Sequence, residues 1–206
     1  KLGLERKLTL HPAALLGAIE LSPLEVSQLY QTIANNGLHR KLSTLHAVTD
    51  QQGHALYTRN HALTRRYNAA EVYLLQYALM QATQRGTGKM LQLTLPGVTL
   101  AGKTGTSSDY RDSWFSGFDQ DSLTTVWLGR DDNAEIGLTG ASGALGVFSQ
   151  FYSLKGANSL VRAMPEQVSL QAFSLKTGYA VSQSCLNILL LPAISVEMPA
   201  DSECIN

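Results

Sequence analysis

The stretch Leu100-Ala-Gly-Lys-Thr-Gly-Thr-Ser-Ser108 decides how the chain is interpreted, because it satisfies two patterns that need different structures. From Gly97 the sequence is Gly-Val-Thr-Leu-Ala-Gly-Lys-Thr, which matches a phosphate-binding P-loop. From Lys103 it is Lys-Thr-Gly-Thr, a motif that certain serine enzymes carry. A P-loop lies between a strand and a helix, so the residues on each side can separate the two patterns.

These neighbouring residues favour the second pattern. Val98 to Ala101 are mostly strand formers, and Gly105 to Asp109 are turn formers that make poor helix. We therefore expect a strand from Val98 to Thr104 after a turn at Pro96-Gly97. A P-loop nucleotidase is an unfavoured alternative that a nucleotide-binding assay would exclude.

The following residues predict two further strands, Asp112–Phe118 and Leu123–Arg130, joined by a turn at 119–122. Three strands with short links form an antiparallel meander rather than a βαβ unit. A helix over 143–154 is expected to close this region against one face of the sheet.

Four segments of this region occur in a recognisable order: Gly102-Lys-Thr-Gly-Thr106, Trp114-Phe-Ser-Gly117, Trp127-Leu-Gly-Arg-Asp131 and Thr139-Gly-Ala-Ser-Gly-Ala144. Together they resemble the second half of the transpeptidase domain of bifunctional (class A) penicillin-binding proteins. The resemblance implies an α+β fold, shared with serine β-lactamases, whose five-stranded antiparallel sheet packs against helices beside an all-helical subdomain. Residues 1–154 would form the C-terminal half of that domain, and residues 155–206 a small β-rich tail.

The resemblance also implies roles for the central motif. Lys103 would supply the positive charge of a catalytic cleft, and the Thr104 and Thr106 hydroxyls would bind a substrate carboxylate. The Thr106 backbone N–H would be half of an oxyanion hole. Gly105 would let an extended substrate lie against the strand edge. The alternative for Lys103 is a salt-bridged surface residue.

The other two motifs of such enzymes, Ser-x-x-Lys and Ser-x-Asn, do not occur in the chain. We therefore expect the chain alone to be inactive and its parent to cross-link peptidoglycan stem peptides and bind β-lactams. The chain opens on Lys1 without Met, which indicates a fragment or processed product that needs its upstream half. Without that half its buried faces would be bare, so we expect marginal stability or self-association. A non-catalytic binding module and a serine β-lactamase or carboxypeptidase are the alternatives.

Helices are predicted from Ser22-Pro23 to Asn35 or Asn36, and from Asn68 to the turn Arg85-Gly-Thr-Gly88. The second helix is apolar nearly all round and should be deeply buried. A small hairpin is expected, with Ser43–Asp50 and His54–Tyr57 flanking a turn at 51–53. The histidines (His11, His39, His46, His54, His61) show no metal spacing, so we expect neither metal nor cofactor. Sixteen basic and sixteen acidic residues indicate neither nucleic acid nor an anionic membrane as a partner. The family resemblance implies that the parent is periplasmic and anchored in the inner membrane.

The tail repeats the tripeptide, as Lys176-Thr-Gly178, and a hairpin tip explains it best because Gly178 falls where a turn needs positive φ. Cys185 and Cys204 are the only cysteines. With the oxidising periplasm that the resemblance implies, we expect them to form a disulfide. Two unrelated buried thiols are the alternative.

Overall fold

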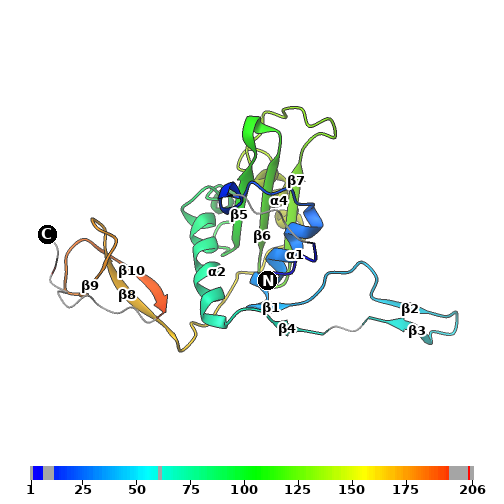
Figure 1. The fold of residues 1–206 in the computed structure, drawn as a ribbon, viewed down its shortest axis with the longest axis horizontal. Coiled ribbons are helices and arrows are strands. Elements are labelled where there is room, and N and C mark those ends of the chain that lie inside the picture. The colour runs from blue at the N-terminus through cyan, green and yellow to red at the C-terminus, as the bar shows by residue number, and fades with distance from the viewer. Residues whose placement is uncertain (1, 7–11, 60–61, 195–203, 205–206) are drawn as a thin grey trace.

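A computed structural model of the chain describes residues 2–6, 12–59, 62–194 and 204. A mixed body of helices and sheet occupies the centre, a long hairpin arm extends from it, and a second small sheet lies on the opposite side (Figure 1). The central sheet has three antiparallel strands in the order β5-β6-β7: Ala101–Thr106, Ser113–Phe118 and Leu123–Leu128. These are the strands that the sequence predicted as a meander.

Helices cover both faces of this sheet. On one face, α4 (Ala144–Lys155) and the short α3 (Leu91–Thr94) enclose a core in which Phe115, Phe148 and Tyr152 are fully buried. On the other face, α1 (Pro23–Ala34) and α2 (Ala69–Gln84) pack against Ala101 and Phe118. The closing helix predicted over 143–154 is confirmed, and α3 was not predicted.

The predicted helix ends are confirmed by their caps. Ser22 and Glu25 form a reciprocal capping box at the start of α1, and Asn35 caps its end before Gly37 at φ +84°. Asn68 accepts a hydrogen bond from the Glu71 backbone N–H at the start of α2.

The prediction that α2 is deeply buried is wrong. Its buried residues lie on one face that includes Gln76 and Thr83, while Leu75 on another face is 42% exposed. The helix packs against the sheet and α1 only along that one face, so part of its apolar surface has no partner within the described chain.

The predicted strand Val98–Thr104 is displaced along the chain: β5 begins at Ala101 and continues to Thr106. The preceding residues serve other contacts, because Leu100 is buried in the α4 core and the Thr99 N–H donates to the Ser159 hydroxyl. Because the strand continues past Lys103 instead of turning into a helix, the P-loop interpretation is wrong.

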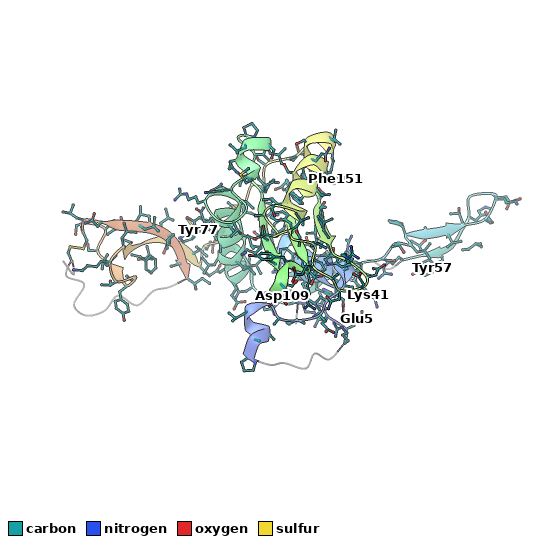
Figure 2. The ribbon with its side chains drawn as sticks, turned by 90° about the horizontal axis from the view of Figure 1, so that it is seen from above. Glu5, Lys41, Tyr57, Tyr77, Asp109 and Phe151 are labelled. Atoms are coloured by element: carbon teal, nitrogen blue, oxygen red, sulfur yellow. A yellow bond between two sulfur atoms is a disulfide. The ribbon has the colours of Figure 1, made fainter. Side chains whose placement is uncertain are left out.

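Two antiparallel pairs build the arm. β1 (Leu38–His39) pairs with β4 (Thr64–Arg65) near the body, and β2 (Ala47–Thr49) pairs with β3 (Ala55–Thr58) at the tip. The pair at the tip confirms the predicted hairpin, with a first strand shorter than the predicted Ser43–Asp50. Every residue of β2 and β3 is exposed. Tyr57 near the tip lies far from the body in the view from above (Figure 2). Short 3₁₀ helices occupy Pro12–Leu16 and Ser108–Tyr110.

The turn between β6 and β7 is built on Asp119, whose side chain is fully buried. One carboxylate oxygen accepts from the backbone N–H groups of Asp121 and Ser122, and the other accepts from the Asn158 backbone N–H. Burial by itself would raise the pKa of Asp119, but these hydrogen bonds outweigh it and lower the pKa. The residue therefore fastens the turn to the segment that follows α4.

The tail forms its own three-stranded antiparallel sheet, in the order β10-β8-β9: Ile188–Ile194, Val168–Ser174 and Ala180–Val181. Lys176-Thr-Gly178 is the turn between β8 and β9, with Gly178 at φ +74°, as predicted. A disulfide joins Cys185 to Cys204, with their Cα atoms 5.3 Å apart. The division of the chain at about residue 154 stays a prediction.

Candidate active-site cleft

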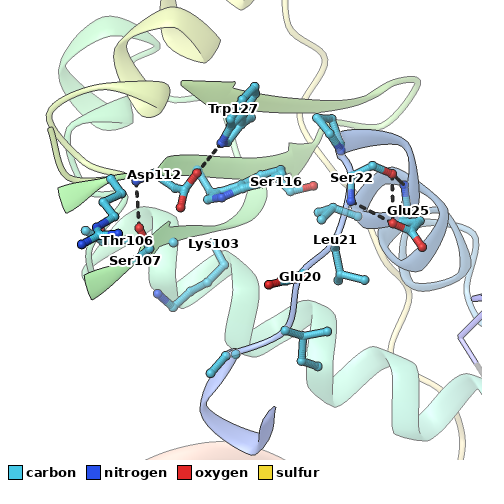
Figure 3. A pocket seen from close by; sticks show the side chains of 18 of the residues that line it. Glu20, Leu21, Ser22, Glu25, Lys103, Thr106, Ser107, Asp112, Ser116 and Trp127 are labelled. Atoms are coloured by element: carbon cyan, nitrogen blue, oxygen red, sulfur yellow. Dashed lines mark hydrogen bonds between the residues drawn. The ribbon is translucent and has the colours of Figure 1, made fainter. Parts of the chain in front are cut away.

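An open cleft of about 1590 Å³ lies along the side of the central sheet. One wall is β5 with the facing parts of β6 and β7, and the other is the segment that leads into α1 (Figure 3). Lys103, Thr104, Gly105 and Thr106 all line this cleft. The structure therefore brings together every cleft residue that the sequence predicted, while Cys185 and Cys204 lie in the tail.

Lys103 is exposed on β5, opposite Ser116 of β6, and lines the cleft (Figure 3). Its ammonium donates to the Thr104 carbonyl oxygen at 3.0 Å and the Thr104 hydroxyl at 3.3 Å. The described residues place no carboxylate within ion-pair distance of it. The ammonium is thus fixed at the strand by neutral groups, which leaves its charge for a ligand.

The Thr106 side chain is held in place by a hydrogen bond from Gly140. The Gly140 backbone N–H donates to the Thr106 hydroxyl oxygen at 2.9 Å. A Cβ at Gly140 would lie 2.6 Å from both the Gly105 and the Trp114 carbonyl oxygens, so only glycine fits there. A hydroxyl oxygen has two lone pairs and one hydrogen, so the Thr106 hydroxyl can accept this bond and still donate its hydrogen to a ligand.

Gly105 faces Trp114 across the ladder, and a Cβ at Gly105 would lie 3.1 Å from the Trp114 Cβ. The indole rings of Trp114 and Trp127 lie next to each other with centroids 6.0 Å apart, and Trp127 donates to Asp112 at 2.8 Å. These contacts make a rigid aromatic wall beside the Lys-Thr-Gly strand.

A chain of hydroxyl groups ties this wall to α1. The Thr125 hydroxyl lies 2.9 Å from that of Ser116 on the neighbouring strand and 2.9 Å from that of Ser27 on α1. Ser116 is the residue opposite Lys103 in the ladder. The helix therefore holds the sheet directly beside the lysine position.

The opposite wall carries an ion pair between Arg6 and Glu25, 2.6 Å apart. The hydrogen bond from the Arg6 guanidinium, with one from the Ser22 backbone N–H, lowers the pKa of Glu25 to about 2. Glu25 is therefore ionised at neutral pH and occupied in holding Arg6 and the helix cap. It does not have the raised pKa of a general acid.

Sequence reasoning missed two residues of this site. Thr87 lies 2.6 Å from the Thr104 hydroxyl through its own hydroxyl, and Gly140 supports Thr106. Each belongs to a glycine-containing segment that the sequence showed, Gly86-Thr-Gly88 and Thr139-Gly-Ala-Ser-Gly143. The signal was present, but the contacts of these residues with Lys103, Thr104 and Thr106 depend on tertiary structure.

None of the histidines that the structure describes lines the cleft. His39 contacts Gln28 and Thr32, and His54 pairs with Asp50, while His11 and His61 lie outside the described residues. Within the described chain no group of His, Cys, Asp and Glu is arranged to hold a metal ion. None of the described helices is long and apolar enough to cross a membrane.

Comparison with known proteins gives a consistent result. Residues 10–131 match the family model of the penicillin binding protein transpeptidase domain. Penicillin-binding protein 1B of Vibrio cholerae is 38% identical to this chain. The similarity covers 100% of this chain and 27% of that protein. Among solved structures, penicillin-binding protein 1A of Haemophilus influenzae is similar over 91% of this chain and 34% of its own, with a TM-score of 0.80 and 20% identity.

A second solved structure is PonA1 of Mycobacterium tuberculosis in complex with penicillin V, similar over 74% of this chain and 43% of its own. Its TM-score is 0.59 and its identity 21%. The chain thus spans about a quarter of the length of its Vibrio cholerae relative and a third to under a half of the two solved chains.

Proposed function

Because the chain belongs to the penicillin-binding protein transpeptidase family, we propose that it supplies the Lys-Thr-Gly wall of a peptidoglycan transpeptidase site. The parent would cross-link stem peptides by serine acyl transfer and be acylated by β-lactams. The observation that carries the proposal is that Lys103, Thr104, Gly105 and Thr106 line one cleft, on a strand whose outer edge no other described strand covers.

The nucleophile would come from outside this chain, since no Ser-x-x-Lys occurs in it. A serine oxygen would bond to the penultimate D-Ala carbonyl carbon, and the C–N bond to the terminal D-Ala would break. The serine proton would leave on the departing amine. An acceptor amine would then take the acyl group and release the serine.

The residues of this chain would bind and orient the donor. The Lys103 ammonium would attract its terminal carboxylate, and the Thr104 and Thr106 hydroxyls would donate to it. The Thr106 backbone N–H would stabilise the oxyanion. An extended peptide would pair with the open edge of β5, where Gly105 has no side chain to obstruct it.

The location we propose is the periplasm, and the disulfide between Cys185 and Cys204 supports an oxidising compartment. We further propose that the remainder of the parent covers apolar surface such as Leu75 on α2. Isolated, the chain should be marginally stable or associate.

The test compares the 206-residue chain with the full-length protein in their reaction with a fluorescent penicillin. The full-length protein should form a stable covalent adduct, and the isolated chain none. Circular dichroism of the isolated chain controls for folding. An adduct on the folded chain would refute the absence of a nucleophile, and no adduct on the full-length protein would refute the transpeptidase assignment.

A further inference from the structure

The turn after α2 contacts the Lys-Thr-Gly strand through Thr87. Its hydroxyl oxygen lies 2.6 Å from the Thr104 hydroxyl oxygen and 3.5 Å from the Lys103 ammonium. Thr87 itself is exposed, so it is not part of the hydrophobic core. The effect of these contacts must therefore come from the orientation of the two groups that Thr87 contacts.

Two glycines hold Thr87 in this place. A Cβ at Gly86 would lie 3.0 Å from the Ala82 carbonyl oxygen, and one at Gly88 would lie 3.2 Å from the same atom. The Gly88 backbone N–H donates to that oxygen at 2.9 Å. The turn is thus folded tightly on the last turn of α2, and larger residues would displace Thr87 from the strand.

The end of α2 is attached to the strand region at a second point. The Thr83 hydroxyl donates to the Leu100 carbonyl oxygen at 2.5 Å, and Thr83 is fully buried. Thr83 and Thr87 are four residues apart, and so are their partners Leu100 and Thr104. The first contact lies inside the core, whereas the second lies beside the cleft.

The direction of the hydrogen bond between the two hydroxyls matters, because each has a single hydrogen. Both oxygens lie within 3.5 Å of the Lys103 ammonium, which donates to them. Thr104 lines the cleft, and Thr87 is not among the residues that the described chain contributes to its lining. If Thr87 donates to Thr104, the Thr104 hydrogen remains available to a ligand in the cleft.

We propose that Thr87 is a positioning residue that donates to Thr104, keeps the Thr104 hydrogen for a ligand carboxylate and holds the Lys103 ammonium at the strand. The proposal deepens the function proposed above and rests on it. Thr87 acts only through its two neighbours, so its effect should depend on whether the ligand carries a carboxylate.

The experiment uses the full-length protein and measures the second-order rate constant of acylation by a labelled penicillin and by its methyl ester, which lacks the carboxylate. Thr87→Val keeps the shape and removes the hydroxyl, and Thr87→Ser restores it. Thr83→Val is the matched control, because it removes the other hydroxyl that links α2 to the strand.

With penicillin, Thr87→Val should be slower by about three- to tenfold, the usual effect of one lost hydrogen bond, and Thr87→Ser within about twofold of wild type. With the ester, wild type and Thr87→Val should react alike. Thr83→Val should lower the melting temperature and leave the penicillin-to-ester ratio unchanged. Because both ligands react with the same sample, this ratio cancels any loss of folded protein.

An unchanged ratio in Thr87→Val would overturn the inference, whether both ligands slow equally or neither slows. Lys103→Ala in the same assay separates the role of Thr87 from that of the strand. If Lys103→Ala slows penicillin acylation and Thr87→Val leaves the ratio unchanged, only the role of Thr87 is wrong. If Lys103→Ala has no effect, the proposed function of the strand fails.

Discussion

The chain contains Lys-Thr-Gly twice, and the two copies adopt different structures. Lys103 to Gly105 lie within β5, in a ladder with β6 and against a core of fully buried aromatic side chains. Lys176 to Gly178 form the turn between β8 and β9, where the Ser174 hydroxyl accepts from the Lys176 and Thr177 backbone N–H groups. The same three residues are a strand in one place and a turn in the other, so the surrounding residues decide which.

The largest expected difference between the copies is catalytic. In the full-length protein, Lys103→Ala should slow acylation by penicillin about a hundredfold or more, the effect of losing a preorganised electrostatic contact. Lys176→Ala is the matched control and should react like wild type, because Lys176 lies on an exposed turn of the tail. Stopped-flow or gel-based acylation rates measure both, and equal rates for the two variants would remove the distinction.

The second difference concerns the disulfide, which is present only beside the second copy. Replacing Cys185 and Cys204 with Ala opens a loop whose ends are 19 residues apart, which should destabilise the tail by about 3 kcal/mol. Amide hydrogen exchange should accelerate in β8 to β10 and stay unchanged in β5 to β7. Loss of penicillin acylation in this variant would show that the tail supports the cleft.

Acid should lower the stability of the central sheet, where the first copy lies, because the turn of this sheet depends on ionised Asp119. The pKa of Asp119 is lower in the folded protein than in the unfolded chain, where the pKa of Asp is about 3.9. The ionised carboxylate therefore stabilises the fold fully above that unfolded pKa. This stabilisation is lost as the pH falls through the folded pKa. Asp119→Asn should destabilise the central sheet by about 1–3 kcal/mol at pH 7. Because the variant lacks this carboxylate, its stability should fall less than that of the wild type when the pH drops below about 4.

Urea unfolding followed at several pH values by tryptophan fluorescence measures this effect, because Trp114 and Trp127 both lie in the central sheet. Asp131→Asn is the control, since Asp131 is an exposed carboxylate outside this turn. Equal losses of stability in the two variants would contradict the role given to Asp119.

The smallest expected effect concerns the glycine of the second copy. Gly178 has φ +74°, and a Cβ at this position would meet no atom within 4 Å, so Gly178→Ala should cost about 1 kcal/mol of backbone strain alone. Gly53→Ala in the arm is its control, because Gly53 has φ +86° and equally open space. Hydrogen exchange should show each loss only in its own hairpin; a change at β5 from Gly178→Ala would contradict the comparison.

Local signals predicted the local features well. The Ser22 and Glu25 capping box, the Asn68 cap and the Gly178 turn are confirmed because each is determined by a few neighbouring residues. The start of β5 was misplaced because Leu100 is directed to the α4 core by tertiary packing, which its β propensity does not reveal.

The cleft could be predicted only in part. Lys103 and its neighbours were identifiable because they are consecutive in the sequence, and the family motif names them. Thr87 and Gly140 reach them across 17 and 34 residues of sequence, through the fold of α2 and the loop before α4. The exposed face of α2 could not be anticipated, because an apolar helix does not reveal which of its faces finds a partner.

The position of β5 at the edge of the sheet has a consequence for solubility. Among the described strands β5 pairs with β6 alone, so its other backbone edge can pair with any extended chain, including a second copy of this protein. A lysine on such an edge opposes that pairing, because two copies would bring like charges together. Lys103 should therefore also reduce aggregation through the edge of β5.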